Sequence, residues 1–479
     1  MVGTAGGGGE EAVRRWVEAG GGRLVLDGGL ATELEANGAD LNDPLWSAKC
    51  ILASPHLIRK ASRTTLSPQN HHSSGEADSA ARGDAAVLQN LIFFPLFVPR
   101  LETKLTSETP RVVKIVISLG SQFTTSSKGV GTRKEISLYK KEYGECPHSS
   151  TRVGSLVNDM NSAVAWYSYA GIWACGGDWN KSSIVHALLP NLLIHQETVY
   201  ACLLILVHMD YLEAGANIII TASYQATIQG FESKGFSKEQ SENLLTKSVE
   251  IAREACEMFL KEHLDQSIPA QKPILVAASI GSYGAYLADG SEYSGDYGEA
   301  GTIEFLKDFH RRRLQVLAEA GPDLIAFETI PHKLEAQAYV ELLEECNIHI
   351  PAWFSFNSKD GVNIVSGDSL IECATIADKC AKVGAVGINC TPPRFIHGLI
   401  LSIRKITDKP ILIYPNSGER YDGEKKEWVE STGVSDGDFV SYVNEWCKDG
   451  AALIGGCCRT TPNTIRAIHR TLNQGSNTQ

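Results

Sequence analysis

The sequence alternates short, almost continuously apolar segments with longer segments of helical periodicity, and this alternation constrains the fold more than any other feature. The apolar segments span residues 23–29, 217–224, 273–281, 323–329, 352–357, 385–390, 410–416 and 452–458. Segments that are apolar without alternation are typical of parallel strands buried on both faces of a sheet. The segments between them, such as 238–264 and 301–321, have helical spacing. Eight strand–helix units predict a (β/α)8 TIM barrel of the α/β class.

Composition and motifs exclude several other classes of protein. An open, doubly wound sheet is the alternative fold, but no G-x-G-x-x-G motif follows the first predicted strand. The formal charge of -12 argues against nucleic acid or an anionic membrane surface as a partner. No secretory signal is recognised, and the 12 cysteines are scattered without the short spacings of a disulfide framework. We therefore expect a cytoplasmic monomer that acts on small molecules and keeps its cysteines reduced.

The alternation is interrupted once, inside the helix that follows the first strand. This helix starts over 54–60 and resumes at Val207, and joining Lys60 to Val207 restores helical spacing between Leu57, Val207 and Tyr211. The residues in between, 61–206, carry 13 basic and 11 acidic side chains and lack sustained periodicity. A structureless segment of this length inside a compact domain is abnormal. We interpret it as an insertion that resembles a retained intron, and a genuine inserted domain is the alternative.

The predicted organisation therefore has four parts. They are a flexible tail with a short helix over 1–22, a barrel over 23–60 and 207–472, the insertion over 61–206, and a C-terminal tail over 473–479. The apolar runs within the insertion are too short or too interrupted to span a bilayer. No membrane association is expected from them.

Polar residues collect where the predicted strands end, which is the face that carries the active site of a TIM barrel. Among them are Asp27, Glu328 and three cysteines, Cys390, Cys457 and Cys458. Three thiolates that leave a fourth position open form a tetrahedral zinc site of the catalytic type. Two alternatives remain: a cysteine at a strand end is often a small buried apolar residue, and the adjacent Cys457 and Cys458 could form a strained disulfide.

Four segments together resemble the motifs of the homocysteine S-methyltransferase family, especially its plant members that use S-methylmethionine. They are DGGLATELE (27–35), FETI (327–330), GINC (387–390) and GGCCRTTP (455–462). The resemblance covers residues from about 20 to 60 and from 207 to 472, and it implies a TIM barrel that holds Zn²⁺. The family's three cysteine ligands match Cys390, Cys457 and Cys458. Residues 61–206 are absent from the family pattern.

The resemblance also implies a reaction, in which a sulfonium donor passes a methyl group to the thiol of L-homocysteine and methionine is formed. A free thiol with a pKa of about 8.5 is mostly protonated at neutral pH, and zinc would deprotonate it. No catalytic side chain is expected beyond this zinc-activated substrate thiol. The family's homocysteine-binding acids match Asp27 and Glu328, and backbone amides around Gly28 and Gly29 are expected to hold the substrate carboxylate. Capping of the following helix is the alternative role for each acid.

The loop over 282–300 is the candidate site for the donor, because it carries four tyrosines together with Asp289, Glu292 and Asp296, which suit a sulfonium cation. A solvated barrel loop is the alternative. S-methylmethionine is the expected donor, with S-adenosylmethionine as the second choice and betaine less supported. No Asp-x-His-x-x-Gly motif of a cobalamin module is present. The competing hypothesis is a non-catalytic or misfolded zinc-binding barrel disabled by the insertion.

Overall fold

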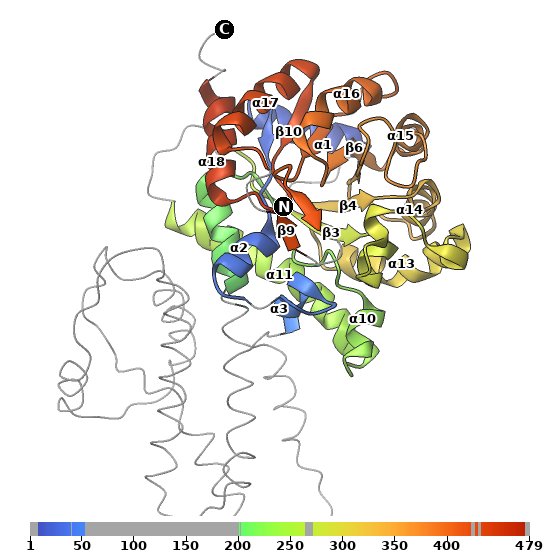
Figure 1. Ribbon diagram of the computed structural model, residues 1–479. Coiled ribbons are helices and arrows are strands. Elements are labelled where there is room, and N and C mark those ends of the chain that lie inside the picture. Colours follow the sequence, from blue (N-terminus) through green and yellow to red (C-terminus); the bar gives the residue numbers. More distant parts are fainter. Residues whose placement is uncertain are drawn as a thin grey trace, which may run out of the picture. The chain divides into compact units, whose positions relative to one another are not determined.

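The eight predicted strands form one parallel sheet that closes on itself (Figure 1). In this computed structural model the described residues are 8–39, 41–52, 201, 203–263, 272–422, 427–429 and 433–474. The strands are β1 (Leu24–Val25), β2 (Ile218–Ile220), β3 (Leu275–Gly281), β4 (Leu324–Ile330), β5 (Ala352–Phe356), β6 (Val383–Asn389), β7 (Ile411–Tyr414) and β10 (Ala451–Ile454). Their order is β1-β10-β7-β6-β5-β4-β3-β2, and a parallel bridge between Leu26 and Ile218 joins the two ends. The predicted TIM barrel is confirmed.

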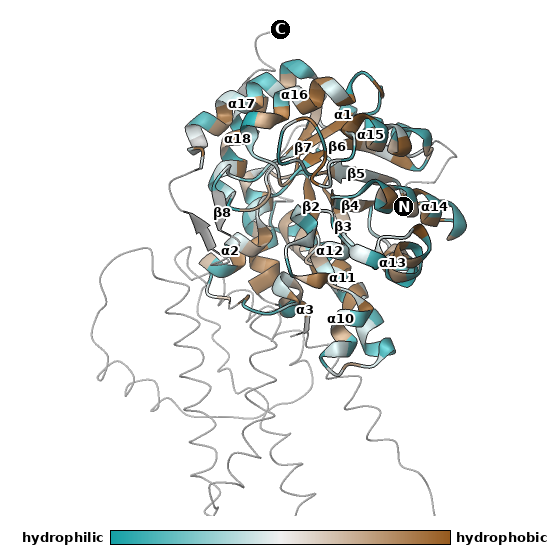
Figure 2. Ribbon diagram, turned by 45° about the vertical axis from the view of Figure 1, so that its right-hand side comes forward, coloured by the Kyte–Doolittle hydropathy of each residue, from teal (hydrophilic) through white to brown (hydrophobic). Residues whose placement is uncertain are grey.

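Helices surround this barrel, each packed on the next. They include α10 (Ile228–Ser233), α11 (Lys238–Glu262), α13 (Ile303–Glu319), α14 (Lys333–Glu345), α15 (Leu370–Lys379), α16 (Pro393–Ile403), α17 (Asp436–Asp449) and α18 (Pro462–Gln474). Ser and Thr side chains cap several of them; Ser237, for example, forms a capping box with Gln240 at the start of α11. Such a cap contributes about 1 kcal/mol to helix stability. Figure 2 shows the strands at the centre as mainly hydrophobic, with hydrophilic residues on the surrounding helices.

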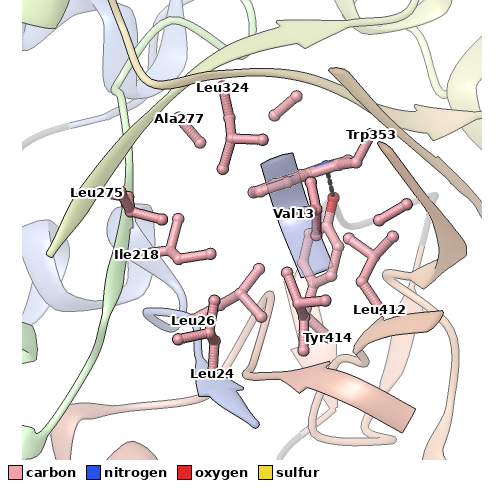
Figure 3. Packing of buried hydrophobic residues seen from close by; sticks show 13 residues of the cluster. Val13, Leu24, Leu26, Ile218, Leu275, Ala277, Leu324, Trp353, Leu412 and Tyr414 are labelled. Carbon is pink, nitrogen blue, oxygen red and sulfur yellow. Dashed lines mark hydrogen bonds between the residues drawn. The ribbon is translucent and has the colours of Figure 1, made fainter. Parts of the chain in front are cut away.

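The interior of the barrel is packed with side chains. Trp353 and Tyr414 are the largest members of a buried cluster that Figure 3 shows around Val13. Trp353 Nε1 donates a hydrogen bond of 3.2 Å to the Tyr414 hydroxyl, so the polar atoms of both rings are satisfied. Because the interior of a TIM barrel is a core and not a pore, ligands have to bind at its rim.

The short N-terminal helix is part of the barrel's packing. Helix α1 (Gly9–Ala19) places Val13, which is 1% exposed, in the barrel cluster, and Gly9 donates to the Ala381 carbonyl just before β6. Burial of one valine side chain contributes about 1.5–3 kcal/mol. The helix predicted within 1–22 is therefore present and packs on the barrel, while residues 1–7 lie outside the described residues.

The predicted boundary of the insertion falls inside a regular helix. Residues 203–214 are continuously helical, and Leu203, Leu204 and Ile205 are 4%, 0% and 3% exposed. The last residues assigned to the insertion thus provide a helical turn ahead of Val207, and no change of structure marks the step from Leu206 to Val207. Residues 54–60 lie outside the described residues. The interpretation of 61–206 stays a prediction.

The remaining described elements lie near the rim of the barrel. They are α2 (Leu30–Ala36), a 3-10 turn at Trp46–Ala48, α3 (Lys49–Leu52), α12 (Tyr283–Leu287), two further 3-10 turns at Ser291–Tyr293 and Gly298–Ala300, and the hairpin of β8 (Arg420–Asp422) and β9 (Glu427–Val429). Within the described part of the chain, every helix is too short or too polar to cross a bilayer.

Candidate metal and substrate site

Three cysteine sulfur atoms meet at the carboxyl ends of β6 and β10. The sulfur of Cys458 lies 3.8 Å from that of Cys390 and 3.9 Å from that of Cys457, and all three sulfurs lie within 4.8 Å of one another. In a tetrahedron with Zn–S bonds of about 2.3 Å, the sulfurs are about 3.8 Å apart. The spacing therefore fits a zinc ion held by three thiolates, with the fourth position directed away from the cysteines.

The disulfide alternative is not borne out in the structure, in which all nine cysteines of the described residues are free. Burial raises the pKa of Cys50, Cys256 and Cys373 to about 12, so these thiols stay protonated and unreactive. Cys390 differs, because hydrogen bonds from Cys457 and Cys458 hold its pKa well below the usual range of a thiol. Cys390 is thus chemically distinct from the buried structural cysteines, whereas hydrogen bonding with Cys390 raises the pKa of Cys457 and Cys458.

The backbone at two strand ends is held in an unusual conformation. Cys390, directly after β6, has a φ of +46°, and Thr329 in β4 has a φ of +54°. Residues other than glycine adopt such angles at a cost of about 1–3 kcal/mol, and only where the surroundings impose them. Here Asn389 imposes them: its Oδ1 accepts from the Thr329 amide at 2.9 Å, and its Nδ2 donates to the Thr329 hydroxyl at 2.7 Å. This pair ties Cys390 to the strand end that carries Glu328.

The turn that holds the cysteine pair depends on glycine. A Cβ added to Gly456 would lie 2.1 Å from the Thr460 hydroxyl oxygen, so a side chain cannot be accommodated there without rearrangement. The Gly456 amide donates to the Asp27 carbonyl at 3.0 Å, and the Cys457 amide donates to the Pro415 carbonyl at 2.8 Å. These bonds place the pair between β1 and β7, next to Asp27.

Asp27 is a buried carboxylate, 1% exposed, at the end of the first strand. Its Oδ2 accepts a hydrogen bond of 2.8 Å from the Ile220 amide, whereas its Oδ1 has no partner among the described residues. Burial raises its pKa well above the usual range. An unpartnered buried acceptor is costly unless a ligand supplies the donor, and an ammonium group would do so.

Glu328 lies on β4 and is 7% exposed. The Ser279 hydroxyl donates to its Oε1. Burial raises the pKa of Glu328 to about 7, while hydrogen bonds from Ser279 and Tyr414 act in the opposite direction. Asp27 and Glu328 influence each other electrostatically and line the same cavity, so the structure brings the two predicted acids together.

Gly28 and Gly29 line the cavity, but their first role is packing. The Gly29 amide already donates to the carbonyl of Thr460 at 3.0 Å, so it is engaged within the protein. A Cβ at Gly29 would lie 2.7 Å from the Cys457 carbonyl, and one at Gly28 would lie 2.8 Å from the Tyr211 ring. Binding of a carboxylate near these residues stays a prediction, and the Gly29 amide is not free for it.

The two acids, the two glycines and the three cysteines line one cavity of about 770 Å³. This volume lies within the range of about 300–1,000 Å³ that is usual for small-molecule sites. Strand-end reasoning missed three further lining residues, Trp46, Tyr224 and Arg459. The rings of Trp46 and Tyr224 are 6.2 Å apart in an edge-to-face arrangement, and Arg459 forms an ion pair of 2.6 Å with Glu419. The sequence signal for Tyr224 was its position soon after the second strand, whereas Trp46 lies outside any strand.

Some side chains of the loop over 282–300 line the cavity, and others pack in the protein core. Glu292 and Tyr293 line the cavity, and the Tyr293 hydroxyl lies 3.7 Å from the Cys390 sulfur. Tyr283 and Tyr297 instead pack on each other, and the Tyr297 hydroxyl donates to Glu335 at 2.6 Å. The loop is therefore more than a solvated connection, but only one of these three tyrosines reaches the cavity.

Comparison with known proteins identifies related chains. The model of the family described as homocysteine S-methyltransferase matches residues 24–66 and 172–472, which is well over half of the chain. A Zea mays protein named homocysteine S-methyltransferase 3 is 64% identical over 475 residues, covering 99% of this chain and 97% of the relative. The selenocysteine methyltransferase of Astragalus bisulcatus is 64% identical over 277 residues, covering 56% of this chain and 82% of the relative.

A solved structure has the same kind of fold. The homocysteine methyltransferase MmuM from Escherichia coli, in its oxidised form, superimposes with a TM-score of 0.50 and 37% sequence identity. The superposition covers 63% of this chain and 92% of that one.

Proposed function

The chain belongs to the homocysteine S-methyltransferase family and is a methyltransferase, and from that premise we propose that it uses zinc to move a methyl group from S-methylmethionine to L-homocysteine. One observation carries the proposal: three cysteine sulfurs at tetrahedral spacing lie in the same cavity as two buried carboxylates. The alternative of a non-catalytic barrel is not favoured, because the three cysteines and the two acids line one cavity.

Cys390, Cys457 and Cys458 would hold the zinc ion. When bound, zinc lowers the pKa of a coordinated homocysteine thiol, so that the sulfur is presented as a nucleophile at neutral pH. No side chain then has to act as a general base. The Asn389–Thr329 pair and the glycine-dependent turn keep the three ligands in place before substrate arrives.

Asp27 and Glu328 would bind and orient homocysteine through its ammonium group. The unpartnered Oδ1 of Asp27 gives that ammonium a hydrogen-bond acceptor, and the two acids together provide the negative charge. Binding homocysteine by its ammonium group also fixes the position of its thiol. The thiol is then already oriented toward the donor when the reaction starts. Burial of both carboxylates strengthens the attraction because water screens it poorly.

The donor's sulfonium would lie on the aromatic side of the cavity. Trp46, Tyr224 and Tyr293 line this part, and aromatic faces attract cations. In the transfer, the methyl–sulfur bond of the donor breaks as the bond to the homocysteine sulfur forms. The donor sulfur becomes a neutral thioether, and the thiol proton is released to solvent. S-methylmethionine therefore gives two molecules of methionine per turnover, and S-adenosylmethionine gives one.

An assay of the purified full chain tests the proposal. With zinc, homocysteine and S-methylmethionine, we expect methionine to accumulate at two molecules per homocysteine consumed. Removal of zinc by a chelator should abolish product, and adding it back should restore it. Absence of methionine with either sulfonium donor, in a zinc-loaded protein, would refute the proposal.

One comparison favours a second acceptor, selenocysteine, because a relative named selenocysteine methyltransferase is 64% identical to this chain over 277 residues. A selenol ionises more readily than a thiol and needs less activation by the metal. Selenocysteine is also one methylene shorter than homocysteine, so its ammonium would have to reach Asp27 from a different distance. Competition between the two acceptors in one assay measures the preference directly.

A further inference from the structure

The lining of the cavity is rich in acidic side chains. Among the described residues its lining includes six acids, Asp27, Glu35, Asp43, Asp289, Glu292 and Glu328, and a single basic side chain, Arg459. Arg459 is paired with Glu419, and Asp43 is paired with Lys234 at 3.0 Å. Homocysteine brings one ammonium, which the proposed function assigns to Asp27 and Glu328. Glu35 and Asp289 are exposed to solvent, which leaves Glu292 as the remaining acid that is partly shielded from water.

In the described part of the chain, Glu292, like Asp27, has an unpartnered carboxylate oxygen. Its Oε2 atom is buried and has no hydrogen-bond partner among the described residues. The residue is held in place by its backbone: the Asn357 Nδ2 donates to the Glu292 carbonyl at 2.8 Å, and Gly284 packs so closely that an added Cβ would lie 2.5 Å from the Glu292 amide nitrogen. An anchored, buried acceptor without a donor indicates that a ligand supplies one.

Within an amino-acid sulfonium compound, the ammonium is the group that can donate the missing hydrogen bond. A sulfonium is a cation without N–H bonds, so it can satisfy the charge of Glu292 but not its vacant hydrogen-bonding position. An ammonium satisfies both. The positive charge on the donor sulfur decreases as the methyl group leaves. A carboxylate next to the sulfonium would therefore stabilise the bound donor more than the transition state, and such an interaction slows the reaction.

We propose that Glu292 binds the α-ammonium group of the methyl donor, and thereby selects amino-acid sulfonium compounds over sulfonium compounds that lack an amino group. This inference rests on the proposed function and deepens it. The cavity then holds two amino acids, with the homocysteine ammonium at Asp27 and Glu328 and the donor ammonium at Glu292. The aromatic pair of Trp46 and Tyr224 remains available for the sulfonium.

The test compares two donors on the zinc-loaded full chain. S-methylmethionine carries a sulfonium, a carboxylate and an ammonium; dimethylsulfoniopropionate carries the first two only. We expect the wild type to prefer S-methylmethionine by about 100-fold or more in kcat/KM, since a site built for an N–H group rejects an analogue without it. Glu292→Gln should reduce this ratio by about 30-fold or more, the lower end for losing one partner of a buried charge pair. The loss should be in the KM for S-methylmethionine, with the KM for homocysteine unchanged.

Two variants and a binding measurement complete the design. Glu299→Gln, at an exposed position of the same loop, should keep the wild-type ratio. Glu292→Asp keeps the charge but withdraws it by one methylene, so its ratio should lie between those of wild type and Glu292→Gln; it also replaces Glu292→Gln if that protein is insoluble. S-methylmethionine alone should raise the Tm of the wild type and not that of Glu292→Gln.

The outcomes separate two failures. If the wild type forms no methionine from S-methylmethionine, the proposed function is wrong. If the wild type is active and the Glu292 variants keep its donor ratio, only the assignment of Glu292 is wrong. A rise in the homocysteine KM of Glu292→Gln at constant donor ratio would overturn the assignment in favour of a place in the homocysteine site.

Discussion

Single residues of the cavity owe their chemistry to burial at the ends of strands. Asp27 and Glu328 are carboxyl groups that the fold removes from water, and burial raises the pKa of both. Cys390 is buried too, yet neighbouring thiols lower its pKa, because they stabilise the thiolate by hydrogen bonds. The same rim therefore favours a cationic group at its acids and a metal ion at its sulfurs.

Removing Glu328 should weaken homocysteine binding without disturbing the metal. Glu328→Ala eliminates one partner of the proposed buried charge pair, which costs about 2–5 kcal/mol. We expect the KM for homocysteine to rise accordingly and the zinc content to remain at one equivalent. Atomic absorption and steady-state kinetics measure the two quantities. Loss of zinc with unaltered homocysteine affinity would contradict the role given to Glu328.

The pH dependence of homocysteine use should reflect the raised pKa of Glu328, which is about 7. Only the ionised carboxylate attracts an ammonium, so protonation weakens binding as the pH falls through 7. We expect kcat/KM for homocysteine to decline from pH 8 to pH 6, and Glu328→Gln to show lower activity with a shallower decline. An identical acid limb in wild type and Glu328→Gln would exclude Glu328 as its source.

At the scale of elements, hydrogen bonds between the ends of β4 and β6, which flank β5, hold the rim of the barrel together. Asn389 at the end of β6 bonds both the amide and the hydroxyl of Thr329 in β4. Both Thr329 and Cys390 have positive φ angles, so the pair maintains a conformation that the residues would not adopt alone. One side chain thus connects the proposed metal ligand Cys390 with the strand that carries Glu328.

Asn389→Ala should therefore lower both stability and zinc affinity. It leaves the buried Thr329 amide without its acceptor, which costs about 1–3 kcal/mol, and it frees the backbone at Cys390. Loss of a residue that orients a metal ligand typically lowers metal affinity by about 10–100-fold. Asn347→Ala is the matched control, because Asn347 also has a positive φ, at +51°, but is exposed just after the C-terminal end of α14 and does not line the cavity.

Thermal unfolding and competition for zinc with a coloured chelator measure the two effects. Asn347→Ala should lose stability only. Equal zinc affinity in wild type and Asn389→Ala would show that the pair does not support the metal site.

The elements also show what can be predicted from sequence. Apolar segments without alternation predicted all eight barrel strands. The ends of these strands predicted that Asp27, Glu328 and three cysteines lie at one rim. Both predictions depend only on the local sequence pattern and on the common direction of parallel strands. Trp46 was not predicted, because it lies in a turn whose position over the rim follows from tertiary packing. Tyr293 lines the cavity and Tyr297 is buried against α14, and these positions follow from tertiary contacts of the loop with Asn357, which follows β5, and with Glu335 in α14, which no local pattern encodes.

At the scale of the whole molecule, the barrel is assembled from segments separated by residues 61–206. The helix over 203–214 covers the barrel without a break, and Leu203 and Leu204 are buried in it. Joining Lys60 to Val207 would place Leu57 and Ile58 at these two positions, so the apolar face of the helix would be kept. The family match is interrupted between residues 66 and 172, inside the same region.

Deletion of residues 61–206 should accordingly give a soluble and more stable methyltransferase of 333 residues. Closure entropy grows by only about 0.6 kcal/mol per doubling of loop length, so the gain should come mainly from removing apolar runs such as residues 91–99 that favour aggregation. Expression of both forms, with Tm and methionine production compared, tests this. An insoluble deletion beside a stable full chain would establish the segment as a true structural element.

Methyl transfer should depend on a zinc ion that Cys390, Cys457 and Cys458 hold. Zinc content and methionine formation are determined together for the full chain, for Cys458→Ser and for Cys447→Ser, which alters a half-buried thiol on α17. We predict one equivalent of zinc and full activity for wild type and Cys447→Ser, and neither zinc nor methionine for Cys458→Ser. Full activity in a zinc-free Cys458→Ser protein would contradict the claim.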